Sequence, residues 1–237
     1  MSNVKTAAAF EEFIGYCSGY GGSYNPGSPN LKLSALIELS EKSRQVMEAM
    51  NVTNSEMNLA TNNREIAFAG LPKLASSITF ALAASGASEQ TMNDVRAIIR
   101  LMTSRRKSRG PVASGAAVPE QKGRSIGQRS FVSMTNHLAR LVQLLREEPL
   151  YQPLESHLSI AGLEDHVAKL RNLTTMVNEA RVSFSNARIA LVRTYYTDTH
   201  SVVATGRSAK KYVRSVFGLN SIQYEQVKRI IFTKPKF

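Results

Sequence analysis

Residues 163–191 read LEDHVAKLRNLTTMVNEARVSFSNARIAL, and this stretch decides the fold. Its apolar residues recur at alternating spacings of four and three, which is typical of a helix that packs along another helix. Neither Gly nor Pro interrupts residues 163–200. A helix of about 35 residues is about 50 Å long at 1.5 Å per residue. It is too long for a compact half of this chain unless it pairs with a second long helix. The seam residues are Leu173, Val177, Ala180, Phe184, Ala187 and Leu191.

The expected partner is a second copy of the same stretch within the chain. When residues 24–60 are shifted by 127 positions, eight of them meet an identical residue. A Tyr-x-Pro motif opens both copies, at Tyr24 and at Tyr151. The matched residues are Tyr24, Pro26, Leu31, Leu36, Lys42, Arg44, Asn51 and Ala60, which meet Tyr151, Pro153, Leu158, Leu163, Lys169, Arg171, Asn178 and Ala187.

A second block of identities returns at a shift of 132, where Gly86 meets Gly218 and Val95 meets Val227. Self-similarity of this length indicates an internal repeat. We therefore expect an all-α protein with two pseudo-symmetric helical halves from an internal duplication, packed through long seam helices. The expected domains are a helical repeat over 1–103, a basic flexible linker over 104–130, a second helical repeat over 131–232 and a tail over 233–237.

Apolar periodicity and the positions of Gly and Pro predict the individual helices. Residues 15–30 are rich in Gly, Ser, Pro and Asn, which predicts a loop. Its three tyrosines, Tyr16, Tyr20 and Tyr24, either anchor the loop to the body of the protein or stack on bases. Gly86 and Gly218 are expected to end helices, and FTKPKF at 232–237 is expected to fray. The predicted helices cover residues 33–68, 72–85, 89–102, 131–146 and 163–200, a helix around Phe10, residues 201–217 and a short element ending near 231.

The net charge of +12 is concentrated in two segments. Residues 103–130 carry +6 and residues 206–237 carry +7, so the rest of the chain is almost neutral. A localised basic patch attracts polyanions in a salt-dependent manner. A solvated surface with a disordered basic linker is the alternative, because runs of like charge are often only solvated.

The sequence GRSAKKYVR at 206–214 places four cations on one side of a predicted helix. The matching segment of the first copy is almost uncharged. We therefore predict nucleic-acid contacts from the linker and from this helix, with a solvated helix end as the alternative. The predicted contact residues are Arg105, Arg106, Lys107, Arg109, Arg207, Lys210, Lys211 and Arg214.

Few residues suggest catalysis. Four histidines lie apart in the sequence without a metal-binding spacing, and Cys17 is the only cysteine. No phosphate loop and no Gly-x-Ser-x-Gly motif is present. We expect a non-enzymatic protein without a catalytic residue, metal or cofactor. The absence of a disulfide, of a secretory signal and of a long apolar run predicts a cytoplasmic protein that does not enter a membrane.

The second half of the chain resembles a group of uncharacterised bacterial helical proteins. The residues that carry the resemblance are Tyr151, Pro153, Asn178, Ala187, Arg188, Lys210, Tyr212, Phe217, Gly218, Tyr224 and Val227. The resemblance implies an all-helical fold and supplies no activity. The expected function is therefore binding of nucleic acid or of a nucleic-acid-rich particle, and the alternative is a structural or assembly protein whose long helices build a scaffold or a homo-oligomer.

Overall fold

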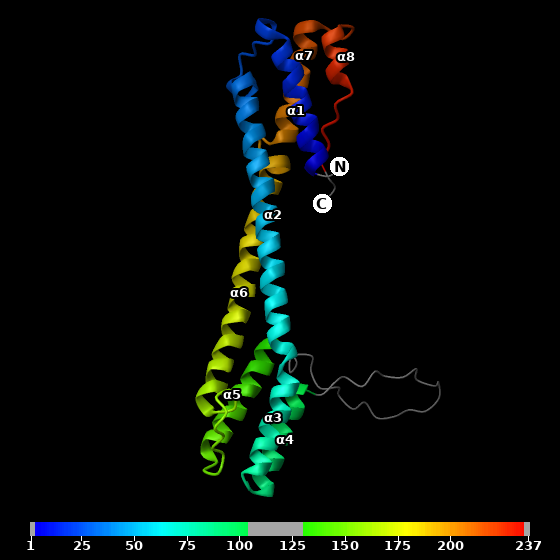
Figure 1. Ribbon diagram of the computed structural model, residues 1–237. Coiled ribbons are helices and arrows are strands. Elements are labelled where there is room, and N and C mark those ends of the chain that lie inside the picture. The colour runs from blue at the N-terminus through cyan, green and yellow to red at the C-terminus, as the bar shows by residue number, and fades with distance from the viewer. Residues whose placement is uncertain (1–2, 104–129, 235–237) are drawn as a thin grey trace, which may run out of the picture. The chain divides into compact units, whose positions relative to one another are not determined.

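The computed structural model describes residues 3–103 and 130–234, and every regular element within these residues is a helix. The all-α prediction is confirmed for this part of the chain. Figure 1 shows the helices in chain order. Their bounds are α1 Asn3–Gly19, α2 Leu33–Ala69, α3 Leu71–Ala84, α4 Glu89–Thr103, α5 Phe131–Glu147, α6 Ile160–Val192, α7 Val202–Phe217 and α8 Ile222–Lys228.

Both long helices form as the sequence predicts. α2 runs unbroken for 37 residues, and α6 runs for 33 residues before a π-helical turn over Arg193–Thr197. Gly86 and Gly218 follow α3 and α7 with positive φ angles of 79° and 91°. Glycine adopts this left-handed backbone without the steric cost that a Cβ atom brings, which explains why the helices end there.

The described chain folds as two compact units. Unit 1 combines residues 1–57 with 180–237, and unit 2 consists of residues 58–179. Each unit therefore contains helices from both predicted repeats. The compact units do not follow the expected boundary at the linker, because the ends of the chain share one core and its middle builds the other.

The core of unit 1 is built by α1, the first turns of α2, the last turns of α6, and α7 with α8. Phe10 and Phe13 of α1 are fully buried there, together with Val203 of α7 and Val227 of α8. The hydroxyl of Tyr195 donates a hydrogen bond of 3.2 Å to the carbonyl of Ser43, which ties the end of α6 to α2. In Figure 1, α1, α7 and α8 lie side by side, in agreement with their contacts.

The core of unit 2 is built by the end of α2, by α3, α4 and α5, and by the first turns of α6. Leu163 and Leu170 of α6 are fully buried in it. Phe68 of α2 packs edge-on against Phe131 of α5, with ring centroids 4.7 Å apart. The side chain of Ser130 accepts a hydrogen bond from the backbone of Ser133, which caps the start of α5.

The two Tyr-x-Pro segments share one hydrogen-bond pattern. The hydroxyl of Tyr24 donates to the carbonyl of Leu31 at 2.8 Å, and the hydroxyl of Tyr151 donates to the carbonyl of Leu158 at 2.9 Å. Both rings are buried. Burial raises the pKa of Tyr151 to about 12, so its hydroxyl remains a donor across the physiological range. Each long helix thus begins after a loop in which the hydroxyl of a buried tyrosine bonds to a backbone carbonyl of the same loop.

The predicted loop over 15–30 is shorter than expected. α1 continues to Gly19, and 3₁₀ turns form at Gly21–Ser23 and Pro29–Leu31. The helix persists through this glycine-rich stretch because Phe13 and Cys17 bury its inner face. Tyr20 anchors the loop by donating to the carbonyl of Gln223 at 2.9 Å, and Tyr24 anchors it as described above.

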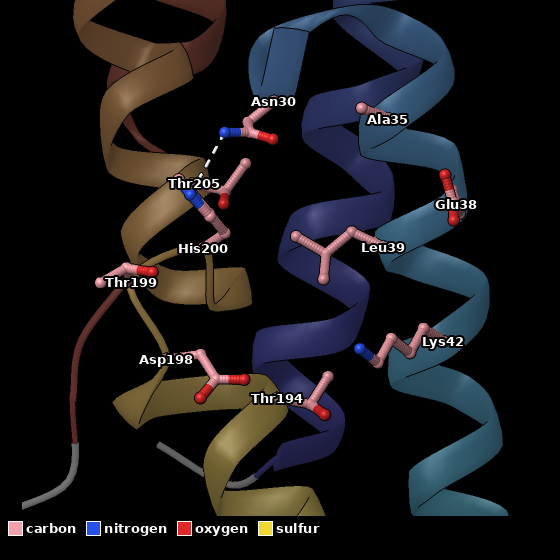
Figure 2. Close-up of a pocket in the computed structure, with 10 residues that line it drawn as sticks. All are labelled: Asn30, Ala35, Glu38, Leu39, Lys42, Thr194, Asp198, Thr199, His200 and Thr205. Carbon is pink, nitrogen blue, oxygen red and sulfur yellow. Dashed lines mark hydrogen bonds between the residues drawn. The ribbon is translucent and has the colours of Figure 1, made fainter.

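The corner between α6 and α7 holds an unusual backbone. The π-helical turn buries three successive side chains, those of Thr194, Tyr195 and Tyr196. Such turns are frequent at functional sites. Asp198 and His200 follow the turn, before Ser201 caps α7. Figure 2 shows this corner facing the first turns of α2.

Candidate nucleic-acid interface

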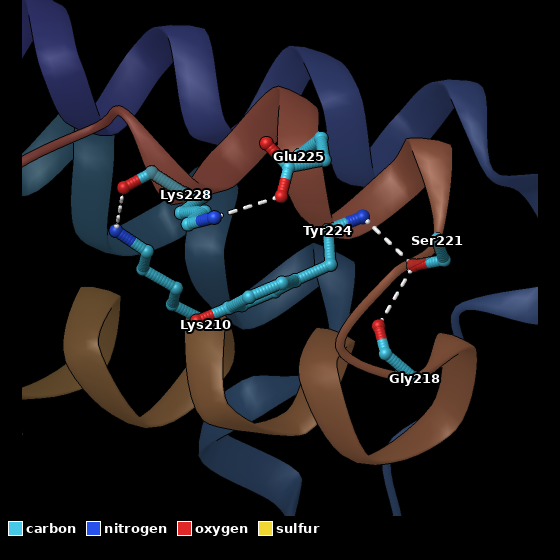
Figure 3. Close-up of polar contacts among 6 residues, drawn as sticks. All are labelled: Lys210, Gly218, Ser221, Tyr224, Glu225 and Lys228. Carbon is cyan, nitrogen blue, oxygen red and sulfur yellow. Dashed lines mark hydrogen bonds and ion pairs between the residues drawn. The ribbon is translucent and has the colours of Figure 1, made fainter.

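The predicted basic helix face lies on α7 in unit 1. Ser201 caps the start of α7, and Gly218 ends it before Ser221 caps α8. Figure 3 shows this connection, in which the hydroxyl of Ser221 donates to the carbonyl of Gly218 at 2.9 Å. Val203 and Val213 are fully buried, so the opposite side of the helix faces solvent.

Lys210 does not belong to the exposed basic face. Its ammonium donates to the carbonyls of Lys228 at 2.6 Å and of Ile230 at 2.7 Å, and Figure 3 shows the first of these bonds. Desolvation by burial lowers the pKa of Lys210. Lys210, a predicted contact residue, is therefore only partly exposed and bonds to the protein backbone. The helix end of α8 leaves carbonyls without partners, and a nearby cation satisfies them.

Arg207 shares this structural task. Its Nε atom donates to the carbonyl of Phe232 at 2.8 Å, although much of the side chain is exposed. Residues 229–234, here called the C-terminal segment, are therefore held against α7 by Arg207 and Lys210. Phe232 is only 5% exposed, so the expectation of a frayed end beginning at this residue is wrong.

Lys211 and Arg214 remain available on the surface of α7. Both are exposed, and no ion pair of either side chain occurs among residues 3–103 and 130–234. The guanidinium of Arg214 lies 5.9 Å from the ring centroid of Tyr224, which orients it beside α8. Spaced three residues apart, these two cations lie on neighbouring positions of one helix face.

The C-terminal segment adds Arg229 and Lys234 to the same positive region, and both are exposed. From residue 199 to the end of the chain Glu225 is the only acid, and it is paired with Lys228 at 2.8 Å. Sequence reasoning counted Arg229 and Lys234 in the local charge without assigning them as contacts. Only the docking of the C-terminal segment on α7 brings them to this region.

The other predicted contacts come from the linker. Arg105, Arg106, Lys107 and Arg109 lie outside the described residues. The candidate interface is therefore built here from α7 and the C-terminal segment. Its exposed cations are Arg207, Lys211, Arg214, Arg229 and Lys234.

The buried titratable groups are poorly suited to catalysis at neutral pH. Burial raises the pKa of Cys17 to about 12, so its thiolate is scarce. Desolvation lowers the pKa of His166, which is therefore neutral. Among residues 3–103 and 130–234, no three His, Cys, Asp or Glu side chains gather in a way that would hold a metal ion.

Within the described chain, the stretch Leu33–Ala84 is long and apolar enough by length and composition to cross a membrane. Part of it belongs to the core of unit 2, where Ile78 and Leu82 of α3 are fully buried. Core helices of soluble proteins share this property.

The chain was also compared with known proteins. No protein-family model matches it, and neither does any curated protein or solved structure. The resemblance to bacterial helical proteins therefore stays a prediction.

Proposed function

We propose that the protein is a non-enzymatic, cytoplasmic binder of nucleic acid, which contacts phosphates through α7 and the C-terminal segment. The observation that carries the proposal is the exposed cationic region of unit 1, with Lys211, Arg214, Arg229 and Lys234 and a single, already paired acid. Phosphate contacts of this kind supply most of the sequence-independent affinity for nucleic acid.

The proposal includes the linker cations as a second contact region. They add a positive charge of +6 between residues 103 and 130. No base-reading motif accompanies either region, so binding is expected to depend weakly on sequence. Contacts from two regions, a helix surface and a basic linker, suit a long polyanion better than a small one.

Salt titration of binding tests this function. Each phosphate contact on duplex DNA contributes about 0.9 to the slope of log affinity against log salt concentration. Replacing Lys211 and Arg214 with glutamine is expected to reduce the steepness of this slope by about 2. Fluorescence anisotropy with duplex DNA and with RNA, at several salt concentrations, measures the effect.

The matched control replaces Arg96 and Arg100 of α4 with glutamine. Both control residues are exposed in unit 2, and the pair removes the same charge. The control is expected to keep the slope of the wild type. Absence of binding by the wild type at low salt, or an equal loss of slope in the control, would contradict the proposed interface.

We further propose that the scaffold arose by internal duplication. The order α1 to α4 then corresponds to α5 to α8. Three observations support the correspondence. α2 and α6 begin at Leu33 and Ile160, which differ by the sequence shift of 127. The two tyrosine hydrogen bonds differ by the same shift. The positive-φ glycines that follow α3 and α7, Gly86 and Gly218, differ by the shift of 132.

Under this proposal the copies are interlocked. Unit 1 contains the first helix of one copy, α1, with the last two helices of the other, α7 and α8. Unit 2 contains α5 with α3 and α4. Each compact core therefore needs helices from both sides of the linker.

Cleavage of the linker tests the interlocked arrangement. A specific protease site inserted between residues 112 and 118 would yield one fragment with α1–α4 and another with α5–α8. The fragments are expected to elute together in size-exclusion chromatography and to separate in urea, because Phe10 and Val203 share one core. Separate elution of the cleaved fragments without denaturant, beside an intact control, would contradict the interlocking.

Assembly into a homo-oligomer is the second candidate function. In unit 2, α2 exposes Leu59 and Ile66, by 62% and 72%, seven residues apart. In unit 1, α6 exposes Val182 and Ile189 at the same spacing. A seven-residue repeat of apolar side chains suits another helix. The mass in solution by light scattering tests this candidate, and a strict monomer would count against it.

A further inference from the structure

We propose that unit 1 holds a binding site for a small zwitterion of the free amino-acid class. The site is a groove of about 400 Å³ between the first turns of α2 and the corner that joins α6 to α7 (Figure 2). Its volume falls within the range of small-molecule pockets. The proposal is independent of nucleic-acid binding, because none of the exposed cations of that interface lines the groove.

Two largely buried threonines offer hydroxyl groups to a ligand in the groove. Thr194 and Thr205 line the groove, although they are only 6% and 4% exposed. Neither hydroxyl has a hydrogen-bond partner among the described residues, whereas Thr53, Thr79 and Thr135 bond to the carbonyl four residues earlier. Neither oxygen is among the fully buried side-chain atoms that lack a partner in the described chain, so both hydroxyls open to the groove and can bond to water or to a ligand.

The charges around the groove have both signs. Lys42 extends from α2 toward the corner, and Asp198 points into the groove from the corner (Figure 2). Glu38 lies at the rim on α2. A ligand with only one charge would leave either Lys42 or Asp198 without an opposite charge, or beside a charge of the same sign. A zwitterion satisfies both, with its carboxylate near Lys42 and its ammonium near Asp198.

The corner is fixed before any ligand binds. Nε2 of His200 lies 3.2 Å from the side-chain amide nitrogen of Asn30, which joins the corner to the loop before α2. Asp198 is within 3.7 Å of Arg193, and its backbone N–H donates to the carbonyl of the same residue at 3.1 Å. Pre-organisation of this kind lowers the entropy cost of binding.

An apolar side chain completes the chemistry. Leu39 extends into the groove between Lys42 and the His200 side of the corner (Figure 2). It offers an aliphatic surface to the side chain of an amino acid, while the polar groups surround its backbone atoms. A ligand such as L-leucine matches both features.

The decisive experiment compares three probes on the wild-type protein. L-leucine carries both charges, 4-methylpentanoate lacks the ammonium, and 3-methylbutylamine lacks the carboxylate. NMR titrations of the histidine ring protons, with His200 assigned from a His200→Gln variant, report binding. L-leucine is expected to shift the His200 signals saturably and to bind at least about tenfold more tightly than either analogue, which corresponds to one charge interaction.

Variants then assign the charges. Lys42→Gln is expected to weaken the binding of L-leucine about tenfold and to leave the binding of 3-methylbutylamine unchanged. Thr205→Val removes one hydroxyl at constant shape and is expected to weaken L-leucine as well. Lys211→Gln, outside the groove, is the control and should bind L-leucine as the wild type does.

Three results would overturn the proposal. They are the absence of a His200 shift with L-leucine up to about 50 mM, where even sites weaker than millimolar begin to fill, equal affinity for a singly charged analogue, and equal losses in Lys42→Gln and Lys211→Gln. The first two can be read on the wild-type protein from the ring signals of all four histidines without assignment, so misfolding of a variant cannot rescue or sink the proposal.

Discussion

Gly206→Ala is expected to destabilise unit 1 by about 1 to 3 kcal/mol, which is the usual cost of overpacking a core. A Cβ atom at Gly206 would lie 2.8 to 2.9 Å from three atoms of the Phe232 ring. Phe10 and Phe13 pack edge-on against the ring with centroids 6.2 and 5.9 Å away, which limits how far it can shift. The ring must leave its place, and the C-terminal segment would follow it.

The sign of this effect makes it diagnostic. Alanine normally stabilises a helix interior by about 1 kcal/mol relative to glycine. Phe232→Ala is expected to cost about 3 to 5 kcal/mol on its own. In that background Gly206→Ala is expected to become neutral or stabilising, because the clash has been removed. Urea denaturation of the four proteins measures the coupling.

An additive double-mutant cycle would contradict the packing of Phe232 on Gly206. The same variants also bear on the nucleic-acid interface. Detachment of the C-terminal segment removes Arg229 and Lys234 from the surface of α7 and leaves Lys211 and Arg214 on it. The salt slope of Phe232→Ala is therefore expected to be shallower than that of the wild type but not abolished.

The sequence predicted helices better than it predicted contacts. Spacing of apolar residues and the glycines at 86 and 218 depend on local backbone preferences, and both long helices and both helix ends follow from them. The direction in which a side chain points depends on what covers it. Val216 of α7 is 47% exposed although its side chain is apolar, and Phe184 of the seam is only half-buried.

The candidate interface was predicted in part for the same reason. A count of charges finds the positive region, because charge is a property of the residues themselves. The count cannot separate Lys211 from Lys210. Lys211 faces solvent, whereas the ammonium of Lys210 donates hydrogen bonds to the backbone carbonyls of Lys228 and Ile230. The groove near His200 left no motif, because its residues come from two stretches of the chain, 30–42 and 194–205, that lie more than 150 positions apart in the sequence.

A second large effect of a glycine substitution is expected for Gly162→Ala at the start of α6. A Cβ atom at this position would collide with the backbone carbonyl of Ser156, which is not the movable end of a side chain. The loop cannot yield locally, because the hydroxyl of Tyr151 holds Leu158 and the backbone N–H groups of Leu158 and Ser159 both bond to Glu155. Moving it gives up buried hydrogen bonds as well as packing.

We expect Gly162→Ala to cost about 2 to 6 kcal/mol, from about 1 to 3 for overpacking and about 1 to 3 for a lost buried hydrogen bond. Gly15→Ala in α1 is the matched control, because no atom lies within 4 Å of a Cβ atom there. The control is expected to stabilise by about 0.5 to 1 kcal/mol. In the proposed first copy Ala35 occupies the matching position, after a loop that forms the 3₁₀ turn Pro29–Leu31. The two copies have thus diverged in how their loops approach the helix. A neutral effect of Gly162→Ala in urea denaturation would show that the Ser156 carbonyl moves aside without cost.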